Sequence, residues 1–457
     1  MLEDILYPEK RKRLKMSSSN TTNRYDKYKD SGILWIGEIP STKNIFRSKY
    51  YLVYQKGKNP SILNTDKVGV PYIGASDLDD ISGNANYENY TTEEFLPVAQ
   101  KDDVLILWDG ARAGLIGKNH SGVISSTIVN LLTNEKYINK NFLYFYLKGF
   151  EKFLYDRVNG TTIPHMNRKY IEELEFINFS IKEQEAIAGY LDRKCGAIDE
   201  TIEKQKSVIE KLKEYKQSII TQAVTKGLDK SAPMKDSGIE WIGQIPQHWE
   251  VEKLKTLFNF GKGLSITKDN LTEMGIPVIS YGQIHSKSNT GTQISDELIR
   301  YVPETYLENN IQSLVNRGDF IFADTSEDIE GAGNCVFVDK QLTLFAGYHS
   351  IILKNKEHDY NLGKYLSYLF QADLWRIQVR ANVNGIKVYS ISQKILKQIT
   401  ALVPSKNEQK QIAEFLDKKC SEIDKTIEDK EKLIKKLVEY KKSLIYECVT
   451  GKRKVVA

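Results

Sequence analysis

The chain repeats itself once, with closely matching ends and dissimilar middles. Residues 30–40 read DSGILWIGEIP and residues 236–246 read DSGIEWIGQIP, so nine of eleven positions are identical. Further along, EQEAIAGYLDRKCGAIDETIEKQKSVIEKLKEY at 183–215 matches EQKQIAEFLDKKCSEIDKTIEDKEKLIKKLVEY at 408–440. Segments that recur meet the same structural demand twice, whereas segments that differ are free to do different tasks. The repeat therefore predicts two equivalent domains related by a pseudo-two-fold.

The recurring carboxyl-terminal segments predict two long helices that pair with each other. Apolar residues keep a spacing of three and four over five heptads in each copy, which is typical of a coiled-coil seam. We expect an antiparallel pair, because each helix follows its own domain. An amphipathic helix packed only on its own domain is the alternative. The expected seam residues are Leu191, Ile198, Ile202, Ile209 and Leu212, with Leu416, Ile423, Ile427, Ile434 and Leu437.

The cysteines are too few and too scattered for a disulfide framework, and no CxxC pair indicates structural zinc. If Gln205 lies opposite Lys430 in the seam, Cys195 falls near Tyr440 and Cys420 lies ~30 Å away along the axis. That separation exceeds the ~7 Å limit for a disulfide. We therefore expect the cysteines to be small core residues. They are Cys195, Cys335, Cys420 and Cys448.

The divergent middles, 47–178 and 253–400, mix short β-rich runs such as Asp103–Trp108 with helical stretches such as Asn141–Leu147. The predicted fold class is α+β: two mixed α/β domains separated by two long helices that form an antiparallel coiled coil, in a pseudo-two-fold internal repeat. The predicted division is a basic, flexible amino-terminal extension at 1–21, domains at 22–180 and 229–405, and helices at 181–228 and 406–457.

Composition narrows the function classes. The chain has 65 Lys+Arg against 60 Asp+Glu, a net charge of +5 that permits a nucleic-acid partner without establishing one. No run approaches the ~18 apolar residues of a membrane span. No GxxxxGK[ST] loop or HExxH motif is present. We therefore expect a cytoplasmic protein that neither hydrolyses nucleotides nor binds a metal.

Two variable domains, each opened by DSGIxWIGxIP and closed by an EQxxIAxxLDxKC helix, closely resemble the specificity subunit of type I restriction–modification enzymes. The resemblance runs from about Asp30 to Gly451. It implies a non-catalytic subunit whose variable domains are target recognition domains, each reading one half of a bipartite double-stranded DNA target. The helices would act as a ruler and dock two methyltransferase subunits, joined in some complexes by restriction subunits. S-adenosylmethionine would then be bound by the methyltransferases, and ATP and Mg by a restriction subunit, with no cofactor in this chain.

Candidate DNA contacts lie in polar, turn-prone stretches, because base edges are read by polar side chains on loops and phosphates by Lys and Arg. The densest stretch is 159–169 in the first copy, and 380–390 takes the same place in the second with different residues. In the first domain the candidates are Lys56, Lys58, Arg112, Lys118, Thr161, Thr162, His165, Asn167 and Arg168. In the second they are Lys262, Lys268, Gln283, His285, Lys287, Arg380, Asn382, Asn384, Lys387 and Tyr389.

No residue pattern predicts catalysis in this chain. His165 and His285 lack a nucleophile or carboxylate at motif spacing, and the acidic run 324–330 is not followed by a carboxylate-x-lysine. The adenine methyltransferase signature NPP[YF] is absent, and the nearest string, at 59–62, is NPSI. Two other functions stay open: a coiled-coil protein–protein adaptor without DNA binding, and a self-contained nuclease or methyltransferase.

Overall fold

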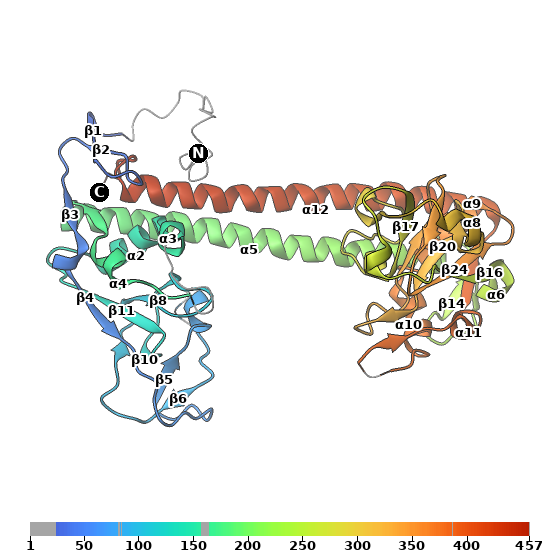
Figure 1. Ribbon diagram of the computed structural model, residues 1–457, viewed down its shortest axis with the longest axis horizontal. Helices are drawn as coiled ribbons and strands as arrows, with labels where there is room; N and C mark the ends of the chain where they lie inside the picture. The colour runs from blue at the N-terminus through green and yellow to red at the C-terminus, as the bar shows by residue number, and fades with distance from the viewer. Residues whose placement is uncertain (1–23, 81–82, 84, 157–163, 386, 457) are drawn as a thin grey trace. The chain divides into compact units, whose positions relative to one another are not determined.

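The computed structural model describes residues 24–80, 83, 85–156, 164–385 and 387–456, and its internal contacts divide the chain into two units (Figure 1). Unit 1 comprises 1–205 and 432–457, and unit 2 comprises 206–431. The boundary falls inside both long helices, α5 (Ile181–Lys226) and α12 (Lys406–Val449). Each unit therefore contains one globular domain and a part of each helix.

Unit 1 contains two four-stranded sheets. The strand order of the first is β4 (Leu52–Lys56), β11 (Ile128–Thr133), β8 (Val104–Leu107) and β9 (Ile116–Gly117), all antiparallel. The order of the second is β6 (Tyr90–Thr91), β5 (Val70–Ile73), β10 (Gly122–Ile124) and β7 (Val98–Ala99), in which β5 and β10 run parallel. Strand β8 is buried along its whole length, so it lies in the core, as its unbroken apolar run predicts.

Unit 2 repeats this plan strand for strand. The first sheet has the order β16 (Phe258–Lys262), β24 (Ser350–Asn355), β20 (Phe320–Ala323) and β22 (Cys335–Phe337). The second has the order β18 (Arg300–Val302), β17 (Ile276–Ile279), β23 (Leu344–Ala346) and β19 (Leu314–Val315). The parallel pair β17 and β23 corresponds to β5 and β10.

Shorter elements complete the units. The remaining two-stranded sheets are β3 (Ile45–Arg47) with β12 (Glu175–Ile177), β15 (Glu250–Lys253) with β26 (Thr400–Val403), and β21 (Thr325–Ser326) with β25 (Tyr389–Ser390). The shorter helices of unit 1 are α2 (Lys140–Gly149), α3 (Glu151–Tyr155) and α4 (Arg168–Glu172). Those of unit 2 are α6 (Leu254–Leu257), α7 (Tyr281–Ile284), α8 (Tyr306–Asn309), α9 (Tyr360–Leu369), α10 (Asp373–Arg380) and α11 (Gln393–Leu396).

The DSGIxWIGxIP motif forms a hairpin whose side chains satisfy its own backbone. The Asp30 carboxylate accepts the Gly32 N–H at 3.0 Å, and Gly32 has φ +72°, a conformation that favours glycine. Ser31 Oγ accepts the Ile33 N–H at 3.1 Å. Residues 236–239 make the same two bonds. The hairpins are β1 (Tyr28–Asp30) with β2 (Glu38–Pro40), and β13 (Met234–Asp236) with β14 (Gln244–Pro246).

The EQ motif begins each long helix with a capping box. The Ser180 N–H donates to the Glu183 carboxylate at 2.8 Å, and the Glu183 N–H donates to Ser180 Oγ at 3.4 Å. Ser405 and Glu408 make the same reciprocal pair in unit 2. Such boxes satisfy backbone N–H groups that have no partner within the helix. The motif therefore recurs because both helices need the same start.

The two long helices run antiparallel in each unit, as the sequence predicts. In unit 1, Lys441 Nζ lies 2.5 Å from Asp199 Oδ2, and in unit 2, Lys216 Nζ lies 2.6 Å from Asp424 Oδ2. Because Asp199 and Asp424 hold equivalent positions in the repeat, these two ion pairs correspond to each other. In the expected seam, Leu191, Ile198, Ile202, Ile209, Leu416 and Ile423 are buried, and Leu212, Ile427, Ile434 and Leu437 are half-buried.

The helix register differs from the expected one. Cys195 belongs to the buried core of unit 1 together with Ile445 and Cys448, whereas Tyr440 is 50% exposed. The Asp199–Lys441 ion pair sets Cys195 against the last turns of α12. Cys195 therefore does not lie near Tyr440, and the register of the two helices differs from the expected one by several residues. Seam spacing alone does not fix the register of an antiparallel pair. All four cysteines are buried and free, and the described residues contain no helix that could span a membrane.

Candidate nucleic-acid interface

In unit 1, candidate side chains gather where the end of β4, the segment after β8 and the segment before α4 meet. The Asp109 carboxylate, just after β8, pairs with Lys56 Nζ at 3.4 Å and with His165 Nδ1. The Arg168 guanidinium lies 5.1 Å from the centre of the Tyr54 ring on β4. Arg168 also pairs with Glu172 at 2.6 Å, so Lys56, His165 and Arg168 form one exposed cluster together with two carboxylates. We call it the unit 1 cluster.

In unit 2, the corresponding place is a cleft of about 740 Å³ between the end of β16, the turn before β24 and the start of α11. His349 in that turn is mostly exposed, and its Nδ1 lies 3.3 Å from Asp324 Oδ1. His349 was missed by the sequence analysis, since a single histidine after an apolar strand carries no spacing signal. The residues that line the cleft include Lys262, Asp324, Tyr348, His349, Gln393 and Lys394.

Lys118 is not available to DNA, which corrects its prediction as a contact. Its side chain is 11% exposed, and Nζ lies 2.8 Å from Asp192 Oδ1 on α5. The ammonium also lies 4.5 Å from the Tyr144 ring centre and 5.0 Å from that of Phe145. Lys118 therefore joins the globular domain to the long helix.

Other candidates in unit 1 are partly committed within the protein. The exposed Arg112 guanidinium pairs with Asp79 and donates to the Ala75 carbonyl at 3.0 Å. Asn167 Oδ1 accepts the Lys169 N–H at 2.9 Å and so caps α4. Lys58 is exposed. The predictions on Thr161 and Thr162 lie outside the described residues.

His285 and Gln283 make internal hydrogen bonds in unit 2, and both side chains are half-buried. His285 Nε2 lies 2.8 Å from the Thr325 carbonyl, and its Nδ1 lies 3.1 Å from Asn334 Nδ2. Since a carbonyl only accepts, Nε2 carries the proton and Nδ1 accepts from the amide. Gln283 Oε1 accepts the Ser280 N–H at 3.2 Å and closes the capping box of α7.

The segment 380–390 is divided between internal bonds and exposed side chains. Arg380 donates to the Glu330 carbonyl at 3.2 Å and pairs with Asp373 at 3.4 Å. Asn382 Nδ2 donates to the Gln378 carbonyl at 2.8 Å. Tyr389 is half-buried in β25. The exposed candidates of unit 2 are Lys262, Lys268, Lys287, Asn382, Asn384 and Lys387.

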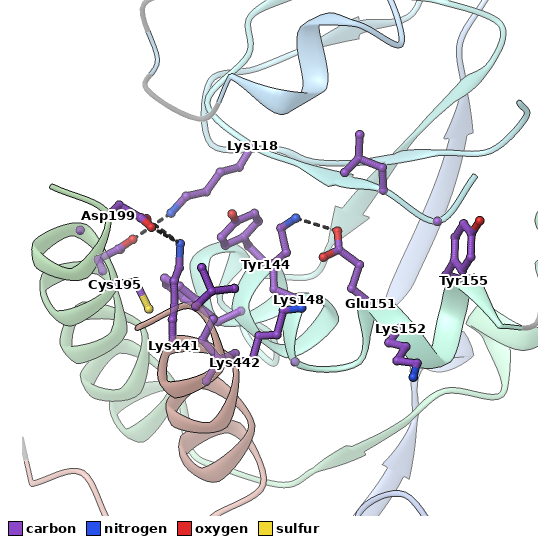
Figure 2. Close-up of a pocket in the computed structure, with 18 of the residues that line it drawn as sticks. Lys118, Tyr144, Lys148, Glu151, Lys152, Tyr155, Cys195, Asp199, Lys441 and Lys442 are labelled. Atoms are coloured by element: carbon purple, nitrogen blue, oxygen red, sulfur yellow. Dashed lines mark hydrogen bonds and ion pairs between the residues drawn. The ribbon is translucent and has the colours of Figure 1, made fainter. Parts of the chain in front are cut away.

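A separate pocket of about 790 Å³ lies in unit 1 between α2, α3 and the long helices (Figure 2). Several of its charged side chains pair with each other: Lys441 with Asp199, and Lys148 with Glu151 at 2.7 Å. Burial raises the pKa of the Cys195 thiol to about 11, so this sulfur is protonated near neutral pH and is a poor nucleophile. Among the described residues, no cluster of three or more His, Cys, Asp or Glu could hold a metal ion.

The chain matches the family model described as "Type I restriction modification DNA specificity domain" twice, over residues 36–213 and 246–437. It is 29% identical over 401 residues to the type I restriction enzyme MjaVIII specificity subunit of Methanocaldococcus jannaschii, covering 86% of this chain and 89% of that one. It is 23% identical over 205 residues to the EcoBI specificity subunit of Escherichia coli, covering 44% of this chain and 42% of that one.

Solved structures share the fold. A chain from a type I restriction–modification system, studied for complex assembly and conformational transition, has a TM-score of 0.67 at 13% identity, covering 90% of this chain and 98% of that one. The HsdS subunit from Thermoanaerobacter tengcongensis has a TM-score of 0.50 at 13% identity with the same coverage. These likenesses concern the fold alone.

Proposed function

The chain belongs to the family of type I restriction–modification DNA specificity proteins, and on this premise we propose that each of its two units reads one half of a bipartite double-stranded DNA target. Membership makes the chain the non-catalytic, sequence-specific DNA-recognition subunit of such a system. In this proposal the target recognition domains are 22–180 and 229–405, and the helices at 181–228 and 406–457 carry them.

The observation that supports two half-sites is the same plan carrying unlike side chains. Both units repeat the order of two four-stranded sheets, the hairpin and the capped helix. At the corresponding corner, however, unit 1 presents Lys56, His165 and Arg168, whereas unit 2 presents Lys262 and His349. Since base contacts specify and phosphate contacts position, unlike side chains on a common plan suit two unlike half-sites.

The DNA contacts we propose are the candidates that the structure leaves exposed. Exposure supports all of them, and Lys56, His165, Arg168 and Lys262 also lie in the unit 1 cluster or the unit 2 cleft. In unit 1 they are Lys56, Lys58, Arg112, His165 and Arg168, and in unit 2 they are Lys262, Lys268, Lys287, Asn382, Asn384 and Lys387.

The proposed protein partners are two methyltransferase subunits, one for each copy of the repeated helix surface. The equivalent ion pairs Asp199–Lys441 and Lys216–Asp424 support this number, because they give two copies of the same helix arrangement. S-adenosylmethionine would then be bound by these partners, and ATP and Mg by a restriction subunit where one joins. We place the complex in the cytoplasm, where host DNA is available.

Methylome sequencing of the host with and without this gene tests the function. We expect one bipartite methylated motif that disappears on deletion. Filter binding of the purified complex should show affinity for that motif that falls steeply with salt, because phosphate contacts release counterions. An unchanged methylome, together with a complex that assembles but binds no DNA, would establish the adaptor function instead.

A further inference from the structure

The backbone hydrogen bonds around the unit 1 cluster and the unit 2 cleft match one for one. In unit 1, the Trp108 N–H donates to the Thr127 carbonyl at 2.7 Å. In unit 2, the Asp324 N–H donates to the His349 carbonyl at 3.1 Å. Trp108 and Asp324 therefore hold equivalent positions, and so do Thr127 and His349.

The strand ends are equivalent as well. Lys56 pairs in register with Val129 on β11, and Lys262 pairs with Ile351 on β24. The residue after each lysine donates its N–H to the first residue of the partner strand, at 2.9 Å in unit 1 and 3.2 Å in unit 2. Lys56 and Lys262 thus lie at the same point of the two sheets, and both are exposed.

The segments before the short helices complete the match. Asn167 caps α4, and Ser392 caps α11. The residue before each cap donates its N–H, at 2.8 Å in both units, to the carbonyl of Trp108 or Asp324. The exposed Lys169 and Lys394 follow two residues after the caps. Hence one backbone arrangement, which we call the shared loop scaffold, is present twice.

Side chains on the shared loop scaffold fall into two classes. Two positions hold lysine in both units, whereas the others differ. The constant pairs are Lys56 with Lys262, and Lys169 with Lys394. The variable pairs are Trp108 with Asp324, Ser126 with Tyr348, Thr127 with His349, and Arg168 with Gln393. Trp108 is buried in the core of unit 1, so its variation reflects packing. A phosphate backbone is the same in every half-site, while base edges differ, so at the solvent-accessible positions constancy indicates phosphate contact and variation indicates base contact.

We propose that the constant lysines of the shared loop scaffold contact DNA phosphates in both half-sites, and that His349, which Asp324 orients, determines specificity for the second half-site. This inference rests on the proposed function and assigns roles within it. Both lysines of each pair are exposed, as phosphate contacts must be.

His349 is held in place for such a role. It has φ +52°, a backbone conformation that is uncommon for non-glycine residues and that defines the turn before β24. Asp324 engages Nδ1 at 3.3 Å, so Nε2 is the ring nitrogen left for a base. Tyr281 and Tyr348 each lie edge-on with ring centres 6.0 Å from the imidazole. Asp324 is thus a positioning residue, and the imidazole presents one polar atom to the cleft.

The test uses the complex of the full chain with its methyltransferase partner, and duplex DNA libraries that randomise each half-site. His349→Asn is the informative variant, because asparagine tolerates positive φ while the imidazole is removed. We expect preference at one position of the second half-site to change by roughly five- to hundredfold, the usual effect of one mismatched base pair, with the first half-site unchanged. Asp324→Asn should weaken the same preference, whereas an Asp324 with only a structural role would leave the base preference alone.

The phosphate contacts have a different signature. Lys56→Ala and Lys262→Ala should each weaken binding to specific and non-specific duplexes alike and reduce the salt slope by about 0.9, without changing the motif. Lys255→Ala, an exposed lysine on α6 away from the cleft lining, is the matched control and should change neither. If the His349→Asn complex still recognises the wild-type motif, the role of His349 is overturned. The proposed function still stands in that case, because the complex recognises a bipartite motif. A wild-type complex without any motif overturns both.

Discussion

At the residue scale, equivalent aspartates of the two repeats are paired with lysines that are not equivalent to each other. Asp192 and Asp417 are equivalent aspartates of the LDRKC and LDKKC segments. Asp192 is paired with Lys118 from the loop after β9, whereas Asp417 is paired with Lys364 from α9, each at 2.8 Å. Both lysine side chains are only 11% exposed. The demand for a buried cation at the helix thus persists although the globular sequences have diverged.

Lys118→Met should therefore lower stability and leave DNA affinity unchanged. We expect the free energy of unfolding to fall by about 1–2 kcal/mol, because Asp192 loses its ion pair and Tyr144 its cation contact. Denaturant titration and filter binding measure the two effects. Lys58→Met is the matched control: it should weaken DNA binding and keep stability within about 0.5 kcal/mol. A loss of DNA affinity in a fully stable Lys118→Met variant would contradict the structural role.

Lys452 should make the stability of unit 1 depend on pH in the alkaline range. Burial lowers the pKa of Lys452 to about 8, although its ammonium donates to the Ile36 carbonyl. Since the pKa in the unfolded chain is about 10.4, the folded state disfavours the charged form, and stability should rise between about pH 8 and pH 10. The difference in unfolding free energy between wild type and Lys452→Met, followed across that range, isolates this group. A pH-independent difference would show that Lys452 titrates normally.

At the element scale, the sequence predicted elements whose signal is local. The hairpins were not predicted, although their turns are set by local residues such as Asp30, Gly32 and their counterparts. The helix seams followed from periodicity. The register of the helix pair did not, because it depends on which side chains meet, as Asp199 and Lys441 do. Local patterns predict elements, and contacts distant in sequence fix how the elements meet.

Ile202→Asp should destabilise the helix pair of unit 1. Ile202 is 7% exposed and belongs to the core that includes residues of both long helices. Removing its packing and burying an unpaired carboxylate should cost about 3 kcal/mol or more. Ser207→Asp, on an exposed position of the same helix, should stay within about 0.5 kcal/mol of wild type. Equal denaturation midpoints for the two variants would contradict a buried seam at this position.

At the scale of the whole molecule, the repeat predicted two equivalent domains, and the family follows from it. The individual contacts were less accessible to sequence reasoning. Lys118 and His285 looked like free polar side chains, yet Asp192 and Asn334, their partners, lie far from them in sequence. His349 became a candidate only when the backbone match with Thr127 was visible. The resemblance carried by the repeated motifs implies a reader of DNA, whereas three-dimensional neighbours decide which side chains are free to read.

Exchange of the second variable segment tests whether specificity is modular. Residues 253–400 would be replaced by the equivalent segment of another protein of this family, keeping 236–246 and α12. The junctions are favourable because Lys253 and Thr400 pair directly across β15 and β26, so the segment enters and leaves at one point. We expect only the second half-site to change in the mapped methylated motif, since the side chains of unit 1 that we propose as DNA contacts are untouched.

The exchanged segment carries Lys364, whose ammonium pairs with Asp417 on α12. The donor segment therefore has to supply a lysine that reaches Asp417, whichever element carries it, as Lys118 reaches Asp192 in unit 1. A matched chimera in which this lysine is changed to methionine separates the two demands made on the segment. It should lose stability while keeping the same new half-site, because the anchor to α12 lies apart from the cleft that contains His349. Methylome mapping of both chimeras decides the matter. If both halves of the motif change together in the stable chimera, the two units do not read DNA independently and the modular account is wrong.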